Sequence, residues 1–169
     1  MRCGVFSAAS GRGDKRVRVC YTSPDYSVDT QKGEDPMEDH FNIVLTDDQL
    51  HAISSIGLAH MGDAVFEILV RTWLCANGKA TGKGLHQATI RLVCAESQAE
   101  KAQRILPELT EEEAGVFRRG RNAQVHTVPG HASRAQYSEA TALEALLGWL
   151  WLKGRKARIA ELFGKMMEG

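Results

Sequence analysis

The segment from residue 140 to 152, ATALEALLGWLWL, restricts the fold of this chain more than any other part. It is apolar over almost its whole length and has helical spacing, which predicts a central, buried helix. A single acid, Glu144, lies within it. Burying a carboxylate without a partner costs several kcal/mol, so a cation or a hydrogen-bond donor has to compensate it. We therefore expect something positive to meet Glu144.

Asp63 is a second acid of this kind. It lies among apolar residues in the segment 56–70 and follows Gly62, whose missing side chain lets another backbone or a ligand approach closely. Two buried carboxylates on separate helices can hold one Mg²⁺, an ion usually bound by one or two carboxylates together with water and substrate phosphate. The pair therefore suits a site that cleaves phosphodiesters. In the alternative interpretation, each acid caps a helix or pairs with an arginine.

Composition sets the limits within which these acids are interpreted. A chain of 169 residues has room for one domain with a real core. Its 21 basic and 21 acidic residues balance, so any nucleic-acid-binding surface has to be local. No apolar run is long enough to span a bilayer, and no signal peptide is evident. The four cysteines have neither metal-ligand spacing nor the number of a disulfide framework. We expect a cytoplasmic protein without a membrane partner.

The first 40 residues differ from the rest of the chain. Glycines, prolines and scattered charges occur there without sustained periodicity, which predicts a flexible N-terminal extension over 1–40 and a folded domain over 41–169. Met37 opens an ordinary sequence and is the expected biological start, so that residues 1–36 are a flexible tail or translated upstream sequence. A short organelle transit peptide is the other interpretation, from the arginines that precede Pro24.

From Thr46 onward every signal is helical, and the fold class we predict is all-α. Thr46 with Gln49, and Thr110 with Glu113, have the spacing of capping boxes, while glycines and prolines separate the segments. No segment alternates as a β-strand does. The expected helices cover residues 47–56, 58–77, 85–105, 111–119, 138–152 and 155–167.

Basic residues gather just before the Glu144 helix, in a stretch from 114 to 137 that contains no acid. Arginine and asparagine side chains suit the phosphates and sugar hydroxyls through which proteins recognise an RNA duplex by shape. A solvated surface without a ligand is the alternative. The candidate RNA-binding residues are Arg118, Arg119, Arg121, Asn122 and Arg134.

Two further features of the sequence bear on metal binding. His126 and His131 lack the companion ligands of a zinc site. Glu67 lies one turn after Asp63 on the same helix face. There it can orient the metal-binding acids without binding the metal itself, or it can form a surface pair with Arg71.

The segments 61–67, MGDAVFE, and 143–148, LEALLG, resemble the two halves of the catalytic signature of the ribonuclease III family. Between them, residues 118–123, 127–129 and 137–144 are similar to the Mini-ribonuclease III group of that family. The resemblance extends from about Leu45 to Leu152.

The resemblance implies an all-helical endonuclease domain that is active as a homodimer and cleaves double-stranded RNA with Mg²⁺. Ribonuclease III surrounds its metal with four acids. Here Ala59 replaces the acid one turn before Asp63, and Thr141 replaces the acid three residues before Glu144. Asp63 and Glu144 are therefore the expected catalytic and metal-binding residues, and Thr141 lies beside them as the Mini group has it.

Only about twenty residues follow Gly148, too few for the separate RNA-binding domain of classical members. The catalytic dimer with its basic segment is therefore expected to hold the substrate. Resemblance to bacterial members implies precursor 23S ribosomal RNA as that substrate, and leaves open an accessory ribosomal protein. Two alternatives remain: a helical RNA-binding or ribosome-associated protein that lost activity, suggested by Ala59 and Thr141, and a helical interaction module without RNA.

Overall fold

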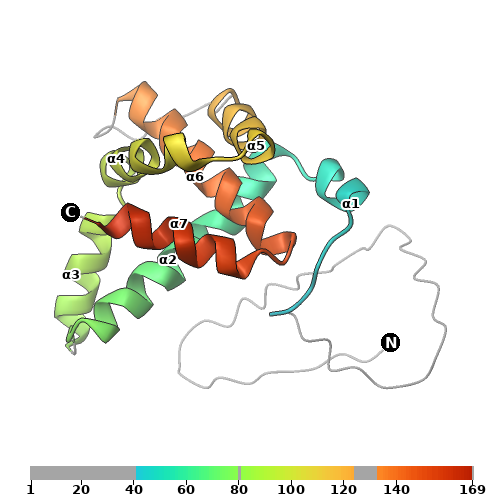
Figure 1. The fold of residues 1–169 in the computed structure, drawn as a ribbon. Helices are drawn as coiled ribbons and strands as arrows, with labels where there is room; N and C mark the ends of the chain where they lie inside the picture. The colour runs from blue at the N-terminus through green and yellow to red at the C-terminus, as the bar shows by residue number, and fades with distance from the viewer. Residues whose placement is uncertain (1–40, 80, 124–132, 169) are drawn as a thin grey trace, which may run out of the picture. The chain divides into compact units, whose positions relative to one another are not determined.

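Seven α-helices and one short 3-10 helix form the part of the chain that the computed structural model describes, residues 41–79, 81–123 and 133–168 (Figure 1). No strand occurs in these ranges, and the predicted all-α class is confirmed. The chain divides into two units, Met1–Pro36 and Met37–Gly169, and only the second contains described residues. The elements are α1 (Asp47–Ala52), α2 (Ser55–Ala76), α3 (Gly82–Val93), α4 (Ala95–Ile105), η1 (Leu106–Glu108), α5 (Glu111–Arg121), α6 (Arg134–Leu152) and α7 (Lys156–Met167).

Hydroxyl caps fix where several helices begin. The backbone N–H of Gln49 donates to Thr46 Oγ1 at 3.3 Å, and that of Glu113 donates to Thr110 Oγ1 at 3.3 Å, so both predicted capping boxes are confirmed. A third box joins Ser133 to Gln136, and α6 therefore begins at Arg134 rather than at the predicted residue 138.

Two further predicted boundaries were wrong. The expected helix over 85–105 is two helices, α3 and α4, because Cys94 between them has an extended backbone with φ −67° and ψ 154°. Gly57 does not separate α1 from α2. Instead the chain leaves α1 at Ile53, and Ser54 caps α2 by accepting a hydrogen bond from the N–H of Gly57, inside the first turn.

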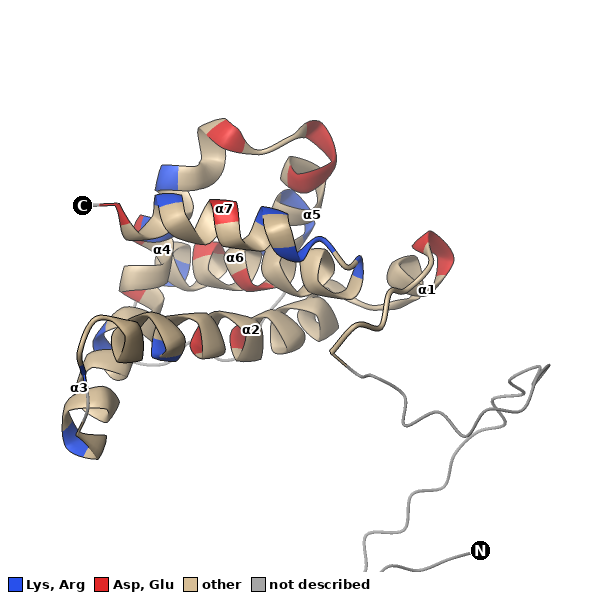
Figure 2. Cartoon of the chain, turned by 60° about the horizontal axis from the view of Figure 1, so that its bottom comes forward, with Lys and Arg blue, Asp and Glu red and all other residues tan. Residues whose placement is uncertain are grey.

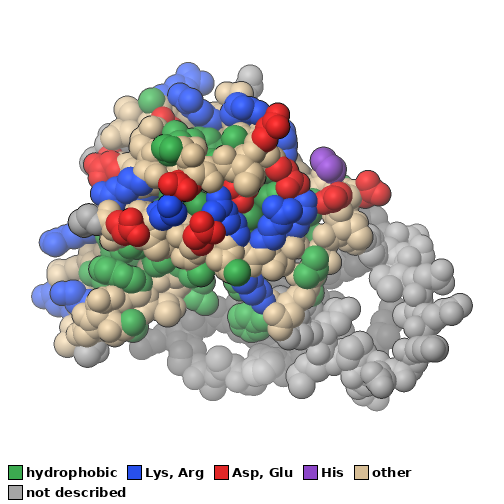
Figure 3. Space-filling model, in the orientation of Figure 1, with side chains coloured by type: hydrophobic (Ala, Val, Ile, Leu, Met, Phe, Trp, Pro, Cys, Tyr) green, Lys and Arg blue, Asp and Glu red, His purple; other side chains and the backbone are tan. Residues whose placement is uncertain are grey.

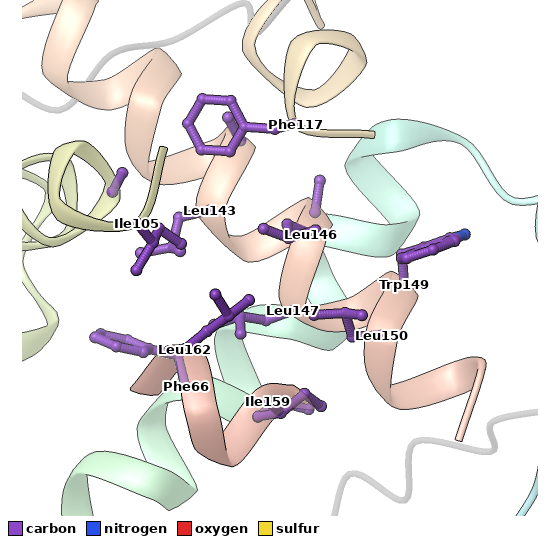
Figure 4. Packing of buried hydrophobic residues seen from close by; sticks show 14 of the residues in the cluster. Phe66, Ile105, Phe117, Leu143, Leu146, Leu147, Trp149, Leu150, Ile159 and Leu162 are labelled. Carbon is purple, nitrogen blue, oxygen red and sulfur yellow. The ribbon is translucent and has the colours of Figure 1, made fainter. Parts of the chain in front are cut away.

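Helix α6 lies at the centre of the domain and packs against α2, α4, α5 and α7. Four leucines of α6 are fully buried, and Figure 4 shows them between α2, α4 and α7: Leu143, Leu146, Leu147 and Leu150. Each such side chain contributes roughly 1.5–3 kcal/mol by leaving water. The predicted central position of the apolar helix that carries Glu144, α6, is confirmed.

Charged side chains cover the outside of this core. Basic and acidic groups are interspersed on the face shown in Figure 3, and several of them pair, including Lys153 with Glu112 at 2.6 Å and Lys165 with Glu108 at 3.0 Å. Among the described residues, no helix is both long enough and apolar enough to cross a membrane. The predicted extension over 1–40, the start at Met37 and the histidines at 126 and 131 lie outside the described residues.

Candidate active site

Two glycines let α2 and α6 touch backbone to backbone. A Cβ atom on Gly62 would lie 1.7 Å from the carbonyl oxygen of Glu144, and one on Gly148 would lie 2.0 Å from the carbonyl oxygen of Leu58. No larger side chain fits at either position without moving the helices apart. Since Asp63 follows Gly62 directly, this crossing brings the two predicted acids together. Figure 2 shows acidic residues on both helices where they run side by side.

Asp63 and Glu144 line one cleft of about 320 Å³. Its walls come from α2, from α6 and from the junction between α3 and α4, so three separate segments of sequence meet there. The remaining lining residues are Val93, Cys94, Ala95, Glu96, Gln98, Tyr137, Ala140 and Thr141.

Glu144 is half-buried and is the more enclosed acid of the pair, and its hydrogen-bond partner is neutral. The pKa of its carboxyl is raised to about 7, chiefly by burial and to a lesser extent by the negative charge of Asp63, while a hydrogen bond from Gln98 acts in the opposite direction. That bond runs from Gln98 Nε2 to Glu144 Oε1 at 3.0 Å. We expected a positive group here, but within the described residues Glu144 meets an amide donor and forms no ion pair.

Asp63 is exposed, so the prediction that both acids are buried was wrong for this one. The reason is helix geometry. Successive residues of an α-helix are rotated by about 100°, so when Gly62 faces α6 the next side chain points to the edge of the contact. Asp63 therefore lies at the rim of the cleft and Glu144 lies within it.

Glu113 shows how this protein treats a buried acid with a structural role. Its side chain is only 1% exposed, and it completes a capping box and accepts two hydrogen bonds from Arg158, at 3.0 Å each. These bonds hold the pKa of Glu113 below its usual value although burial alone would raise it. The alternative interpretation of the two predicted acids was that each caps a helix or pairs with an arginine. That interpretation describes Glu113, but it does not describe Glu144.

The two residues predicted to support the acids are in different places. Thr141 is buried, lines the cleft and lies one turn before Glu144. Glu67 pairs with Arg71 on the outside of α2 and does not line the cleft, which agrees with its alternative interpretation as a surface pair.

The candidate RNA-binding residues surround a different part of the molecule. Arg118 and Arg119, in the last turn of α5, line a separate open hollow together with His51, Glu111, Glu112 and Arg155. Arg121, Asn122 and Arg134 are exposed at helix ends. Within the described ranges, Arg118, Arg119 and Arg121 form no ion pair. None of the five candidates lines the cleft, and residues 124–132 of the basic stretch lie outside the description.

Sequence reasoning missed Gln98 and Glu96. A signal for Gln98 was present, because Gln98, Ala102 and Ile105 have the 4 and 3 spacing of one helix face and the other two are fully buried. A polar residue at an inward position requires a partner. Glu96, in the first turn of α4, carried no comparable signal, since acids are common there.

The donor set fits Mg²⁺. No group of three or more Asp, Glu, His or Cys side chains is arranged to hold a metal within the described residues, so a site has to rest on the two carboxylates. That is the sparse oxygen set on which Mg²⁺ is commonly held, with water and phosphate filling the other positions. Asp63 and Glu144 repel each other and form no ion pair within the described part of the chain, which also favours cation binding electrostatically. Fold and cleft together define an all-helical domain with two carboxylates, Asp63 and Glu144, in one cleft.

Comparison with known proteins agrees with this class. The family model described as the Ribonuclease III domain matches residues 57–155. Mini-ribonuclease 3 of Symbiobacterium thermophilum is 42% identical over 105 residues, which cover 62% of this chain and 81% of that protein. The Staphylococcus aureus protein of the same name is 33% identical over 123 residues, 72% of this chain and 92% of its own length. A solved structure, protein FN1578 from Fusobacterium nucleatum, superposes with a TM-score of 0.65 at 28% identity over 70% of this chain and 96% of that chain.

The chain belongs to the ribonuclease III family, and within it to the Mini-ribonuclease 3 group. It is an endoribonuclease. The predicted resemblance is thereby confirmed, and the two non-enzymatic interpretations are set aside.

Proposed function

We propose that this endoribonuclease cleaves double-stranded RNA in the cleft between α2 and α6, with Asp63 and Glu144 as its catalytic, metal-binding residues. The observation that carries the proposal is the state of Glu144: a carboxylate inside an otherwise apolar helix, next to a second acid, with an amide donor but no cationic partner among the residues that the structure describes. Glu113, a buried acid with a structural role in the same protein, forms an ion pair with Arg158. The partner that would balance Glu144 is therefore a bound cation.

Mg²⁺ is the ion we propose, and when bound it supplies activation of water and neutralisation of charge on the scissile phosphate. Glu144 offers a ligand oxygen from inside the cleft, and Asp63 offers one from the rim, where RNA can reach it. Thr141 leaves room beside Glu144 that a third acid would fill. The apolar walls of the cleft strengthen the electrostatic attraction between these acids and a cation by lowering the local dielectric.

The basic residues Arg118, Arg119, Arg121, Asn122 and Arg134 are proposed to hold the RNA backbone. Their distance from the cleft lining suits contact with phosphates remote from the cut, because an RNA duplex is much larger than the cleft. Arginines without an acidic partner are free to take up phosphate. The hollow that Arg118 and Arg119 line also contains Glu111 and Glu112, but Glu112 is engaged by Lys153 and Arg155.

A homodimer is proposed as the active form, because a duplex presents two strands related by a local two-fold axis and two sites can cut both. Exposed apolar residues on α2 support it: Ile56 is 42%, Ile68 52% and Trp73 36% exposed. Sedimentation should show a dimer. A fully active monomer at the same concentration would contradict the proposal.

The substrate we propose is precursor 23S ribosomal RNA, cut at a base-paired stem in the cytoplasm, with an accessory ribosomal protein as a candidate partner. End mapping of the precursor after incubation with the purified protein and Mg²⁺ tests the substrate, with and without ribosomal proteins. Cuts in unrelated duplexes only would leave the nuclease role standing and refute this substrate.

Cleavage by single variants tests the site itself. Asp63→Asn and Glu144→Gln should each lower the rate of duplex cleavage by orders of magnitude while the protein stays folded, since each removes a charge and keeps the shape. Glu161→Gln is the matched control, because Glu161 is an exposed acid on α7 that pairs with Arg158 outside the cleft. Undiminished cleavage by either cleft variant would remove that residue from the proposed site.

A further inference from the structure

Gln98 connects Glu144 to the junction between two helices. Its side chain is 2% exposed, and Nε2 donates to two acceptors, Glu144 Oε1 at 3.0 Å and the carbonyl oxygen of Val93 at 3.0 Å. An amide nitrogen carries two hydrogens, so both are used. Because both partners are acceptors, the opposite orientation of the amide would lose both bonds.

The break at Cys94 is what makes the second bond available. In a continuous helix the carbonyl of Val93 would accept from the N–H of Ser97, four residues on. Here α3 ends at Val93, the extended Cys94 separates it from α4, and the free carbonyl accepts from Gln98. The backbone N–H of Gln98 donates to Cys94 O at 2.9 Å, which anchors the residue at the same junction.

This arrangement has a cost that packing alone does not explain. Gln98 Oε1 is buried and has no hydrogen-bond partner among the described residues. An unsatisfied buried oxygen destabilises a fold, and a leucine would fill an inward position of α4 without that cost. A buried polar group without a partner calls for an explanation, and a role at a functional site is one.

We propose that Gln98 is a positioning residue that fixes the Glu144 carboxylate and reserves its Oε1, so that Oε2 is the oxygen Glu144 offers to a cation. The inference rests on the proposed metal-binding role of Glu144. Its consequence is metal preference. Mg²⁺ is satisfied by single oxygens from carboxylates, whereas Ca²⁺ takes more oxygen ligands and often both oxygens of one carboxylate. By engaging Oε1, Gln98 favours Mg²⁺ over Ca²⁺.

Titration calorimetry of the full chain without RNA tests this, with Mg²⁺ and Ca²⁺ as separate titrants. Gln98→Leu should weaken Mg²⁺ binding by about 10- to 100-fold, the usual effect of removing a group that orients a metal ligand. The affinity for Ca²⁺ should fall less or rise, so the ratio of the two affinities shifts toward Ca²⁺. Loss of packing alone would not move that ratio.

Two further variants keep the test decisive. Gln98→Met retains an unbranched side chain without the amide and should reproduce the shift in the ratio if Gln98→Leu disturbs folding. Gln103→Leu, an exposed position on the same helix, should leave both affinities unchanged. If Asp63→Asn and Glu144→Gln abolish Mg²⁺ binding but neither Gln98 variant changes the ratio, the inference on Gln98 is overturned and the metal site stands. If the two acid variants bind Mg²⁺ as the wild type does, the metal site itself is refuted.

Discussion

Replacing Glu144 by glutamine should stabilise the metal-free protein above neutral pH, and the gain should disappear in acid. Burial raises the pKa of Glu144 from 4.5 to about 7, so between these values the folded protein binds more protons than the unfolded chain. Stability contributed by the protonated form is fully present below pH 4.5 and is lost as the pH rises through 7. The substituted amide does not titrate, and its oxygen can still accept from Gln98.

The size of the effect follows from the shift. A difference of about 2.5 pKa units corresponds to about 3 kcal/mol of unfolding free energy. This is an upper limit, because Glu144 lines an open cleft and water reaches part of the carboxylate. At roughly 3–4 °C per kcal/mol, a gain of several degrees in melting temperature is expected at about pH 8.

Denaturation in EDTA from about pH 4.5 to about pH 8.5 provides the assay. The matched control is Glu139→Gln, which removes an acid from the same helix outside the cleft lining. Adding Mg²⁺ at about pH 8 should then stabilise the wild type and not Glu144→Gln, since only the ionised carboxylate gains a partner. A difference between variant and wild type that stays constant with pH, or grows toward acid, would refute the account of Glu144.

Three other outcomes are expected. Gly62→Ala should lower both stability and cleavage, because its Cβ would lie 1.7 Å from the carbonyl oxygen of Glu144. Gly164→Ala on α7 is the control, since its Cβ meets nothing within 4 Å and the change should be neutral or stabilising. Equal effects of the two substitutions would argue against the close helix crossing. Substituting Arg118, Arg119 and Arg121 together by alanine should weaken duplex binding in Ca²⁺ and flatten its salt dependence by roughly one unit of log–log slope per lost phosphate contact, and an unchanged slope would show that RNA is held elsewhere. A chain that begins at Met37 should melt and cleave as the full chain does, and a clear loss of either would show that residues 1–36 contribute to the folded domain.

Local signals in the sequence were enough to predict most helix positions. Thr46 and Thr110 predicted the starts of their helices, because a hydroxyl three residues before Gln or Glu forms a local capping box. The structure confirms both boxes. Helix α6 was predictable as the centre of the core, because its apolar residues leave no solvated face. Asp63 and Glu144 were brought together by the crossing of α2 and α6, which Gly62 had suggested.

Features that depend on tertiary contacts were not predictable in the same way. The break between α3 and α4 falls at Cys94, which is neither glycine nor proline and makes no side-chain cap. What holds it there is the bond from Gln98 to Val93, together with the packing of α4 on α6. The exposure of Asp63 depends on the direction in which Gly62 faces, and the neutral partner of Glu144 comes from a helix 46 residues away.

The most direct test of the central claim is to locate the bound metal. Mn²⁺ can replace Mg²⁺ at oxygen sites and scatters anomalously, so a crystal of the protein soaked in Mn²⁺ shows its position without reference to activity. The account predicts an anomalous peak in the cleft, in contact with carboxylate oxygens of Asp63 and Glu144, that is absent from crystals of Glu144→Gln. A peak elsewhere, in a protein that cleaves duplex RNA with Mn²⁺ at full rate, would contradict it.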